Sequence, residues 1–335
     1  MSTILRADAV AAADSIAADV RRYLTATPRQ LPSRALYDTL GSALFDAICH
    51  LPWYPITRAE RRLIAARRAD ILAAAGMCER LIELGCGNGE KLDLLLGSDR
   101  GPADGIPHRI DLVDVSASAL AAASRLISED RDVVVITHQQ RYEEGIRTAT
   151  ASRVAGERIG VVFLGSNIGN FDPPGAAAFL ATVRDSLRLS DSLVIGADLV
   201  KPERELLLAY DDPLGVTAAF NKNLLVRLNR EMGATFDLTA FDHRAIWNAE
   251  QSRVEMHLVS RARQQVDIPA AGLSLRLEKG EPIWTESSYK YEIGSFETML
   301  RGAGFERARH WIEPDGRFVL VVARVAEKGV GSNAN

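Results

Sequence analysis

Short apolar runs alternate with helical segments through the middle of the chain, and this alternation constrains the fold more than any other feature. The runs lie at residues 80–84, 109–115, 132–136, 159–165 and 192–198. Helical spacing fills several of the gaps, as in ASALAAASRLI and AAAFLATVRDSL. Continuous apolar strands separated by helices indicate a parallel sheet that is covered on both faces. The sequence therefore predicts an α/β fold with a mostly parallel sheet.

The end of the chain departs from this alternation. After a helix at FETMLRGAG come RARHWIEP and RFVLVVARV, which Asp315-Gly316 joins in the manner of a hairpin. A mostly parallel sheet that ends in an antiparallel C-terminal hairpin is typical of the Rossmann-like fold of class I S-adenosylmethionine-dependent methyltransferases.

Residues 201–290 interrupt the alternation with two helical stretches and then the strand-like runs RVEMHLVS, QQVDI and LSLRL. We interpret this segment as a second, α+β domain that residues 1–60 complete. The predicted domains are thus 61–200 with 291–326 for the cofactor and 1–60 with 201–290 for the substrate. A helix is predicted at 60–76, after the prolines of LPWYPIT break the preceding one, and residues 327–335 are expected to form a disordered tail.

Composition and charge exclude several classes of protein. The net charge is −4 and the pI is about 5.9, so no broad surface for nucleic acid is expected. The chain has no apolar run of about 18 residues, and acidic residues interrupt the apolar part of MSTILRADAVAAADSIAADV. The cysteines and histidines lack metal-ligand spacing. We therefore expect a cytoplasmic protein without a metal and without a membrane partner. A monomer is also expected, although nothing in the composition determines the oligomeric state.

The stretch ELGCGNGEK, residues 83–91, follows the first predicted strand. A dinucleotide fingerprint would place the third glycine one residue later. Glu83 and Glu90 flank the loop, and each would repel a pyrophosphate by about 1 to 4 kcal/mol at close range. S-adenosylmethionine has no phosphate and carries a positive sulfonium, so acids beside the loop favour it. A nucleotide site and a tight structural turn are the alternatives.

Asp114 ends the second predicted strand, about 25 residues beyond the glycine loop. A carboxylate at that place can accept hydrogen bonds from both ribose hydroxyls of a nucleoside. Dehydrogenases and methyltransferases both use such a residue, so Asp114 does not distinguish them, and a solvated aspartate at a strand end is the alternative interpretation.

With these residues placed, the chain resembles the L-histidine Nα-methyltransferases of ergothioneine biosynthesis from about residue 24 to residue 325. Those enzymes combine a methyltransferase domain with a substrate domain of their own, which agrees with the predicted insertion. The resemblance is carried by TATPRQLPSRALYDTLGSALFDAI, ELGCGNGEK, VVFLGSNIGNF, AYDDPLGVTAAFNKN and TESSYKY.

The resemblance implies a role for individual residues. For S-adenosylmethionine these are Gly85, Gly87, Lys91, Asp114 and Gly165, with Arg141 and Tyr142 near the adenine and Tyr37 and Phe45 near the amine. For histidine they are Asn170 and Tyr210 at the carboxylate, Tyr54, Glu286, Ser287 and Ser288 around the imidazole, and Met256 along the ring pocket.

The residue types suit these roles. An asparagine amide and a tyrosine hydroxyl are neutral donors for a carboxylate. Glu286 and Ser288 alternate along a strand-like segment, so both are expected on one face, where a carboxylate can accept an imidazole N–H.

Two positions depart from the family. It commonly has an Asp-Phe pair where this chain has Arg141-Tyr142, and an arginine cannot accept the adenine amino protons, so a backbone carbonyl must do so. Around Tyr54 the family often reads Tyr-Tyr-Pro-Thr-Arg, whereas this chain has Trp53 before Tyr54 and an isoleucine before the threonine.

The sequence thus predicts an enzyme that methylates the α-amine of L-histidine three times with S-adenosylmethionine, giving hercynine, the first step of ergothioneine biosynthesis. In-line displacement on an activated methyl needs mainly positioning, so no metal is expected, and no general base is evident. One alternative is an N-methyltransferase that acts on another amino acid such as tryptophan, against which Glu286 and Ser288 argue. The other is a non-catalytic S-adenosylmethionine-binding regulator, against which the intact glycine loop and Asp114 argue.

Overall fold

The computed structural model describes residues 16–76, 78–97, 107–129 and 131–327. The predicted disordered tail therefore lies outside the described residues, apart from Glu327. The chain forms two compact units. We call Pro55–Val200 with Tyr289–Asn335 the parallel-sheet unit, and Met1–Tyr54 with Lys201–Ser288 the insert unit.

The parallel-sheet unit contains a seven-stranded sheet in the order β11-β12-β5-β4-β1-β2-β3. The strands β1 to β5 pair in parallel, whereas β12 is antiparallel to both β5 and β11. This is the strand order of the class I methyltransferase fold that the sequence predicts. The strands are β1 (Arg80–Leu84), β2 (Arg109–Asp114), β3 (Val134–Gln139), β4 (Ile159–Phe163), β5 (Ser192–Asp198), β11 (Phe305–Glu313) and β12 (Phe318–Val325).

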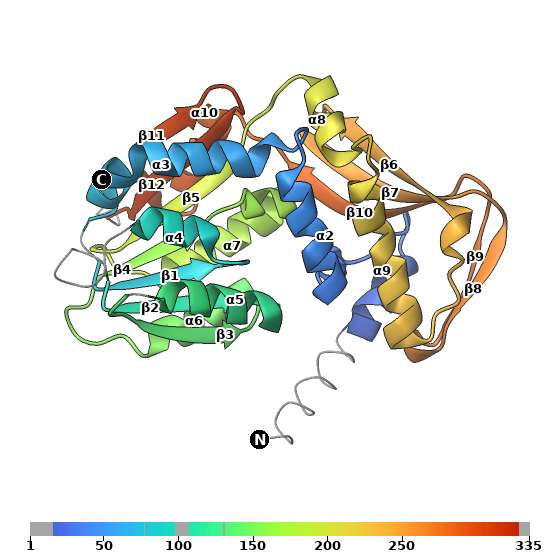
Figure 1. Cartoon of the computed structure of the whole chain (residues 1–335), viewed down its shortest axis with the longest axis horizontal. Coiled ribbons are helices and arrows are strands. Elements are labelled where there is room, and N and C mark those ends of the chain that lie inside the picture. The colour runs from blue at the N-terminus through green and yellow to red at the C-terminus, as the bar shows by residue number, and fades with distance from the viewer. Residues whose placement is uncertain (1–15, 77, 98–106, 130, 328–335) are drawn as a thin grey trace, which may run out of the picture. The chain divides into compact units, whose positions relative to one another are not determined.

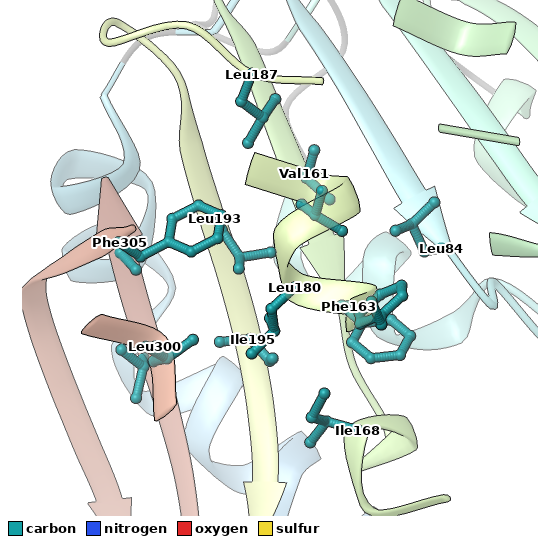
Figure 2. Close-up of a cluster of buried hydrophobic side chains, with 14 of the residues drawn as sticks. Leu84, Val161, Phe163, Ile168, Leu180, Leu187, Leu193, Ile195, Leu300 and Phe305 are labelled. Atoms are coloured by element: carbon teal, nitrogen blue, oxygen red, sulfur yellow. The ribbon is translucent and has the colours of Figure 1, made fainter. Parts of the chain in front are cut away.

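Helices cover both faces of this sheet, as the apolar strands require (Figure 1). One layer consists of α3 (Pro55–Ala75), α4 (Glu90–Leu96) and α5 (Ala117–Ser128). The other consists of α6 (Tyr142–Ala151), α7 (Pro173–Asp185) and α10 (Ile293–Gly302). Figure 2 shows the core between the sheet and the second layer, where Phe163 and Ile195 meet Leu180 and Leu300. Every residue of β1, β4 and β5 is buried.

Among the predicted elements of this unit, two differ most from the structure in their bounds. The helix predicted at 60–76 begins at Pro55, so the expectation that Pro55 lies in a break was wrong. Proline suits the first turn of a helix, where its missing N–H has no partner to lose. The strand predicted at 132–136 is β3, Val134–Gln139, which is at the edge of the sheet and only partly buried.

The direction in which successive strands are added to the sheet reverses between β1 and β4. From β1 the sheet grows to one side through β2 and β3, and from β4 it grows to the other side through β5. In open α/β sheets, ligands bind beyond the carboxyl ends of the strands at such a reversal. The glycine loop and Gly165 follow the carboxyl ends of β1 and β4, and Asp114 is the last residue of β2. The topology alone thus gathers the predicted cofactor residues at one edge.

The insert unit is built on a three-stranded sheet in the order β10-β7-β6, with a two-stranded β8-β9 sheet. Helices α8 and α9 pack on β6 and β7, and α2 packs on α9. Residues 16–24 are also helical, within the predicted helix at 8–25. The elements are α2 (Thr39–His50), α8 (Glu203–Tyr210), α9 (Val216–Met232), β6 (Phe241–Asn248), β7 (Arg253–Ser260), β8 (Gln264–Ile268), β9 (Leu273–Leu277) and β10 (Pro282–Tyr289), with 3₁₀ turns at Ser33–Leu36, Leu238–Ala240 and Pro269–Ala271.

The division between the units falls after Tyr54, whereas the predicted boundary lies after residue 60. Residues 55–60 belong to the parallel-sheet unit because α3 is continuous from Pro55. Glu60 therefore belongs to the parallel-sheet unit, which also contains the glycine loop. None of the described helices is long and apolar enough to cross a membrane.

Candidate functional site

The glycine loop after β1 adopts a backbone that only glycine tolerates easily. Gly85 and Gly89 have φ angles of +73° and +83°, in the left-handed region that other residues avoid. A Cβ on Gly85 would lie 3.0 Å from Asn167 Nδ2 and 3.1 Å from Tyr142 Oη. A Cβ on Gly89 would lie 2.9 Å from both Cα and Cβ of Ala123 on α5. At Gly85 and Gly89 the loop is therefore packed on neighbouring elements with little room for a side chain, whereas a Cβ on Gly87 would meet nothing within 4 Å.

Asp114 connects this loop to the end of β2. Its Oδ2 accepts the N–H of Gly87 at 3.1 Å and its Oδ1 accepts the N–H of Ser116 at 2.9 Å. Burial raises the pKa of the Asp114 carboxyl, although these backbone bonds oppose the rise. Each oxygen keeps acceptor capacity beyond its one backbone bond. The carboxylate is thus held rigidly and fits a pair of ribose hydroxyls.

A group of carboxylates beside the loop is only partly neutralised. Glu83 is buried on β1, and its Oε2 has no hydrogen-bond partner among the described residues. Burial raises the pKa of Glu83 well above its ordinary value; Lys91 lowers it, and Glu60 and Asp114 raise it further. A cation placed here would stabilise the ionised form. The site therefore fits the positive charge of S-adenosylmethionine better than a pyrophosphate.

Lys91 is paired with Glu60, a residue that no sequence motif singled out. The Lys91 ammonium lies 2.6 Å from Glu60 Oε2, and Glu60 is fully buried at the start of α3. Both Glu60 oxygens accept the N–H of Gly165 at 2.9 Å. This carboxylate therefore ties α3, the loop after β4 and α4 together under the glycine loop.

Arg141 and Tyr142, both predicted near the adenine, differ in environment. Arg141 is exposed at the start of α6. The Tyr142 ring packs against Phe163 and Phe179 at centroid distances of 5.3 and 5.9 Å. Burial raises the pKa of the Tyr142 phenol above its ordinary range. Tyr142 thus forms a wall beneath Gly85, and its contact with adenine stays a prediction.

The segment after β4 carries the predicted residues Gly165 and Asn170. Gly165 has a φ of +79° and Ser166 a φ of +58°, which is uncommon for a residue with a side chain. The Ser166 hydroxyl accepts the N–H of Asp198 at 2.9 Å and so fixes this turn to β5. Asn170 ends the following 3₁₀ turn and is exposed. Backbone strain of this kind is often found at ligand-binding sites, and the roles of Gly165 and Asn170 stay predictions.

In the insert unit, five predicted or neighbouring aromatic residues form a continuous group. Tyr37 lies 5.6 Å from Phe45 and 5.6 Å from Phe220, and Tyr54 lies 6.3 Å from Phe45 and 6.2 Å from Tyr210, as ring centroids. Phe220 on α9 was missed by the sequence analysis, although it stands within the AYDDPLGVTAAFNKN motif. The faces of such rings attract cations.

A polar group adjoins these rings through Tyr210. The Tyr210 hydroxyl donates to Ser288 Oγ at 2.7 Å, and both residues are buried. Glu286 is 8% exposed, and Ser287 between it and Ser288 is partly exposed. Alternation along β10 therefore directs Glu286 and Ser288 to one side and Ser287 to the other. Met256 on β7 is 2% exposed.

This bond joins residues that were expected at opposite ends of the substrate, since Tyr210 was predicted at the carboxylate and Ser288 at the imidazole. A hydroxyl both donates and accepts, so each can exchange this partner for a ligand. No group of three or more histidine, cysteine, aspartate or glutamate side chains in the described part of the chain is arranged to hold a metal ion.

A family model described as "Histidine-specific methyltransferase, SAM-dependent" matches residues 16–325. That match spans both units, including the glycine loop, Asp114 and the Tyr210–Ser288 pair. The chain belongs to this family. The cofactor of the family is S-adenosylmethionine, which agrees with the acidic surroundings of the loop.

Curated relatives cover the chain almost completely. The histidine N-alpha-methyltransferase of Mycolicibacterium smegmatis is 41% identical over 96% of this chain and 98% of its own length. The protein of the same name from Mycobacterium tuberculosis is 41% identical over 91% of this chain and 93% of its own. Ergothioneine biosynthesis protein 1 of Schizosaccharomyces pombe is 28% identical over 78% of this chain, which corresponds to 34% of that longer protein.

The residues predicted to form the cofactor and substrate sites of this histidine-specific methyltransferase are divided between the two units. Tyr37, Phe45, Tyr54, Tyr210, Met256, Glu286, Ser287 and Ser288 belong to the insert unit, and Gly85, Gly87, Lys91, Asp114, Arg141, Tyr142, Gly165 and Asn170 belong to the parallel-sheet unit. Glu60 and Asn167 were missed because a buried glutamate on a charged helix and an asparagine in a turn carry no distinguishing local pattern. Their proximity to the glycine loop comes only from the fold.

Proposed function

We propose that this chain transfers methyl groups from S-adenosylmethionine to the α-amine of L-histidine, three times, and so forms hercynine for ergothioneine biosynthesis. The observation that carries the proposal is the buried arrangement of Glu286, Ser288 and Tyr210 beside aromatic rings in the insert unit. A buried carboxylate and a hydroxyl pair suit an imidazole, which presents one N–H donor and one acceptor nitrogen. An apolar side chain would offer these polar groups no hydrogen-bond partner.

The insert unit is proposed to hold the amino acid. Glu286 accepts the imidazole N–H, and Ser288 serves the other ring nitrogen; Tyr54 and Met256 line the ring. Tyr210 exchanges its bond to Ser288 for the substrate carboxylate, and Asn170, which belongs to the parallel-sheet unit, stays a prediction for that carboxylate. Ser287, which alternation directs away from Glu286, supports the strand instead of contacting the ring.

The parallel-sheet unit is proposed to hold the cofactor. Gly85, Gly87 and Gly165 let the backbone approach it closely, because their left-handed φ angles exclude side chains. Asp114 accepts from the ribose, and Tyr142 with Arg141 borders the adenine. Lys91 acts through its pair with Glu60, which keeps the Gly165 turn in place. When bound, S-adenosylmethionine supplies an activated methyl group on a sulfonium.

Repeated methylation requires a pocket that accepts an increasingly bulky cation. The rings of Tyr37 and Phe45 lie edge to face with their centroids 5.6 Å apart, and neither ring carries a formal charge. Cation–π contact with such rings is worth about 0.5 to 2 kcal/mol and grows with desolvation. These rings are therefore proposed to surround the amine as it becomes a quaternary ammonium. We also infer a monomer that acts in the cytoplasm on the free amino acid and binds neither nucleic acid nor membranes.

Mass spectrometry of amino acids incubated with the protein and S-adenosylmethionine tests the proposal. Histidine should gain one, two and then three methyl groups, and tryptophan should remain unmodified. Calorimetry should also detect binding of S-adenosylhomocysteine and none of NADH. Methylation of tryptophan in preference to histidine would overturn the substrate assignment while leaving the cofactor assignment intact.

A further inference from the structure

His243 on β6 joins the end of α8 to the body of α9 within the insert unit. Its Nε2 lies 2.8 Å from the carbonyl oxygen of Tyr210. Its Nδ1 lies 3.0 Å from Nδ2 of Asn221. The imidazole is only 3% exposed, so both ring nitrogens depend on these protein partners.

The two partners determine the protonation of the ring. A carbonyl oxygen only accepts, so Nε2 must carry a hydrogen for the Tyr210 bond. Asn221 Nδ2 also donates to the carbonyl of His257 at 3.2 Å, which identifies that end of the amide as the NH₂ group. Nδ1 must therefore accept, and the network is satisfied by a neutral imidazole with its hydrogen on Nε2.

The Tyr210 carbonyl needs this donor. Tyr210 is the last residue of α8, and the last carbonyls of a helix have no N–H partner within it. His243 supplies one and so fixes the end of the helix. The Tyr210 side chain leaves from that point to reach Ser288 Oγ at 2.7 Å and the ring of Tyr54 at 6.2 Å. The position of the hydroxyl thus depends on His243.

We propose that His243, oriented by Asn221, is a positioning residue that holds Tyr210 in place for the amino-acid substrate and is no longer oriented by Asn221 when the imidazole is protonated. This inference rests on the proposed function, because it requires Tyr210 to contact the substrate. A second hydrogen on Nδ1 would point at the NH₂ group of Asn221, so protonation breaks that bond. Asn221 thereby couples the charge of His243 to the geometry of α8.

Charged groups from the surrounding elements also face the ring. Asp211 Oδ1 lies 3.9 Å from Nε2, with Asp212 beyond it and Lys222 on α9. The residue paired with His243 on β7 is the uncharged Leu258. Burial lowers the pKa of His243; the bond to the Tyr210 carbonyl, Asp211 and Asp212 raise it, and Lys222 lowers it again. The net direction is downward, so loss of the Asn221 bond is expected below the ordinary histidine pKa of about 6.5.

The first experiment compares H243F with H243Q through the KM for L-histidine. Glutamine keeps one donor and one acceptor but does not titrate, whereas phenylalanine keeps neither. Near pH 8 we expect H243F to raise KM by about five-fold or more and H243Q to change it by about two-fold at most. The affinity for S-adenosylhomocysteine should stay within about two-fold in both, because His243 lies outside the parallel-sheet unit.

The pH profile distinguishes positioning from a merely structural role. The substrate titrates too, so the informative quantity is the ratio of wild-type KM to H243Q KM at each pH. This ratio should rise as pH falls below about 6.5, since only the wild type loses its Asn221 bond. A flat ratio would overturn the proposal, and this comparison remains decisive if H243F fails to fold.

A double-mutant cycle with Y210F tests whether the effect passes through Tyr210. The double variant Y210F/H243F should resemble Y210F alone, because a hydroxyl that is absent cannot be displaced. Effects that multiply would show that His243 acts elsewhere. Failure of wild-type protein to methylate histidine would refute the proposed function instead, whereas normal wild-type turnover with additive variants would refute only the positioning role.

Discussion

The two units solve the problem of ligand binding with different parts of the polypeptide. In the parallel-sheet unit the predicted cofactor site consists mainly of backbone. Its glycines Gly85 and Gly89 have φ angles of +73° and +83° and pack against neighbouring elements. In the insert unit the residues predicted to bind the substrate do so through side chains, which include the hydrogen-bonded Tyr210–Ser288 pair and the group of five contacting rings. A backbone site suits a cofactor shared by many enzymes, while a side-chain site can be altered residue by residue to select a substrate.

The largest expected effect comes from placing a side chain on a glycine of the glycine loop. In Gly89→Val, the new Cβ would lie 2.9 Å from Cα and Cβ of Ala123, so α4 or α5 must shift. We expect calorimetry to show at least about 100-fold weaker binding of S-adenosylhomocysteine.

Gly156→Val is the matched control, because Gly156 has a φ of +80° and nothing within 4 Å of its Cβ position. It imposes the same backbone strain without a clash and should leave cofactor affinity unchanged. Equal losses in both variants would show that general strain, and not packing of the loop, governs binding.

The next effect should be confined to substrate choice. Glu286→Ala removes the strongest acceptor from the proposed imidazole site, and a hydrogen bond to a carboxylate is worth about 1.5 to 3 kcal/mol. We expect kcat/KM for histidine to fall roughly 10- to 200-fold and the ratio of tryptophan to histidine activity to rise. Kinetics with both amino acids measure this.

Ser287→Ala serves as its neighbour control, since Ser287 is partly exposed and alternates away from Glu286. It should retain nearly full activity. If Glu286→Ala lowers activity toward both amino acids by one common factor, Glu286 does not recognise the ring, and the selection of substrate by side chains must lie elsewhere.

In the parallel-sheet unit, Asp114 differs from the glycines because it is predicted to bind the cofactor through its side chain. Asp114→Ala removes an acceptor that is already held by Gly87 and Ser116, and should weaken S-adenosylhomocysteine binding by about 1 to 3 kcal/mol, or roughly 5- to 150-fold. Because burial raises the pKa of Asp114, the carboxylate is lost on acidification earlier than an exposed aspartate would be.

Wild-type affinity should therefore decline as pH falls through this raised pKa, whereas Asp114→Ala should show a weaker dependence. Calorimetry across an acidic pH series compares the two slopes. Parallel slopes would mean that another group, such as Glu83, is the one that titrates.

The smallest effect is expected from Tyr210→Phe. Removing a single neutral hydroxyl costs about 0.5 to 1.5 kcal/mol, so the KM for histidine should rise roughly 2- to 12-fold. The affinity for S-adenosylhomocysteine should be unchanged, which steady-state kinetics and calorimetry together can establish. A comparable loss of cofactor affinity would show that Tyr210 supports the fold as a whole.

Sequence reasoning succeeded where the signal was local. The apolar runs at 80–84 and 192–198 became β1 and β5 with unchanged bounds, because wholly buried strands leave a continuous apolar pattern. Strand β6, FDHRAIWN, was not predicted, since its polar residues hide the alternation. Pro55 was interpreted as a helix break although it begins α3, because a proline can follow the end of one helix or stand in the first turn of the next.

The sequence by itself determined the parallel sheet, the terminal hairpin, the glycine loop and the family, since periodicity, turn chemistry and motif spacing are properties of neighbouring residues. Only the tertiary structure decided which distant groups meet. Glu60 reaches the N–H of Gly165 across 105 residues, and Tyr210 reaches Ser288 across 78. No local propensity specifies such pairs, because a hydrogen bond between buried side chains depends on how complete helices and strands pack around them.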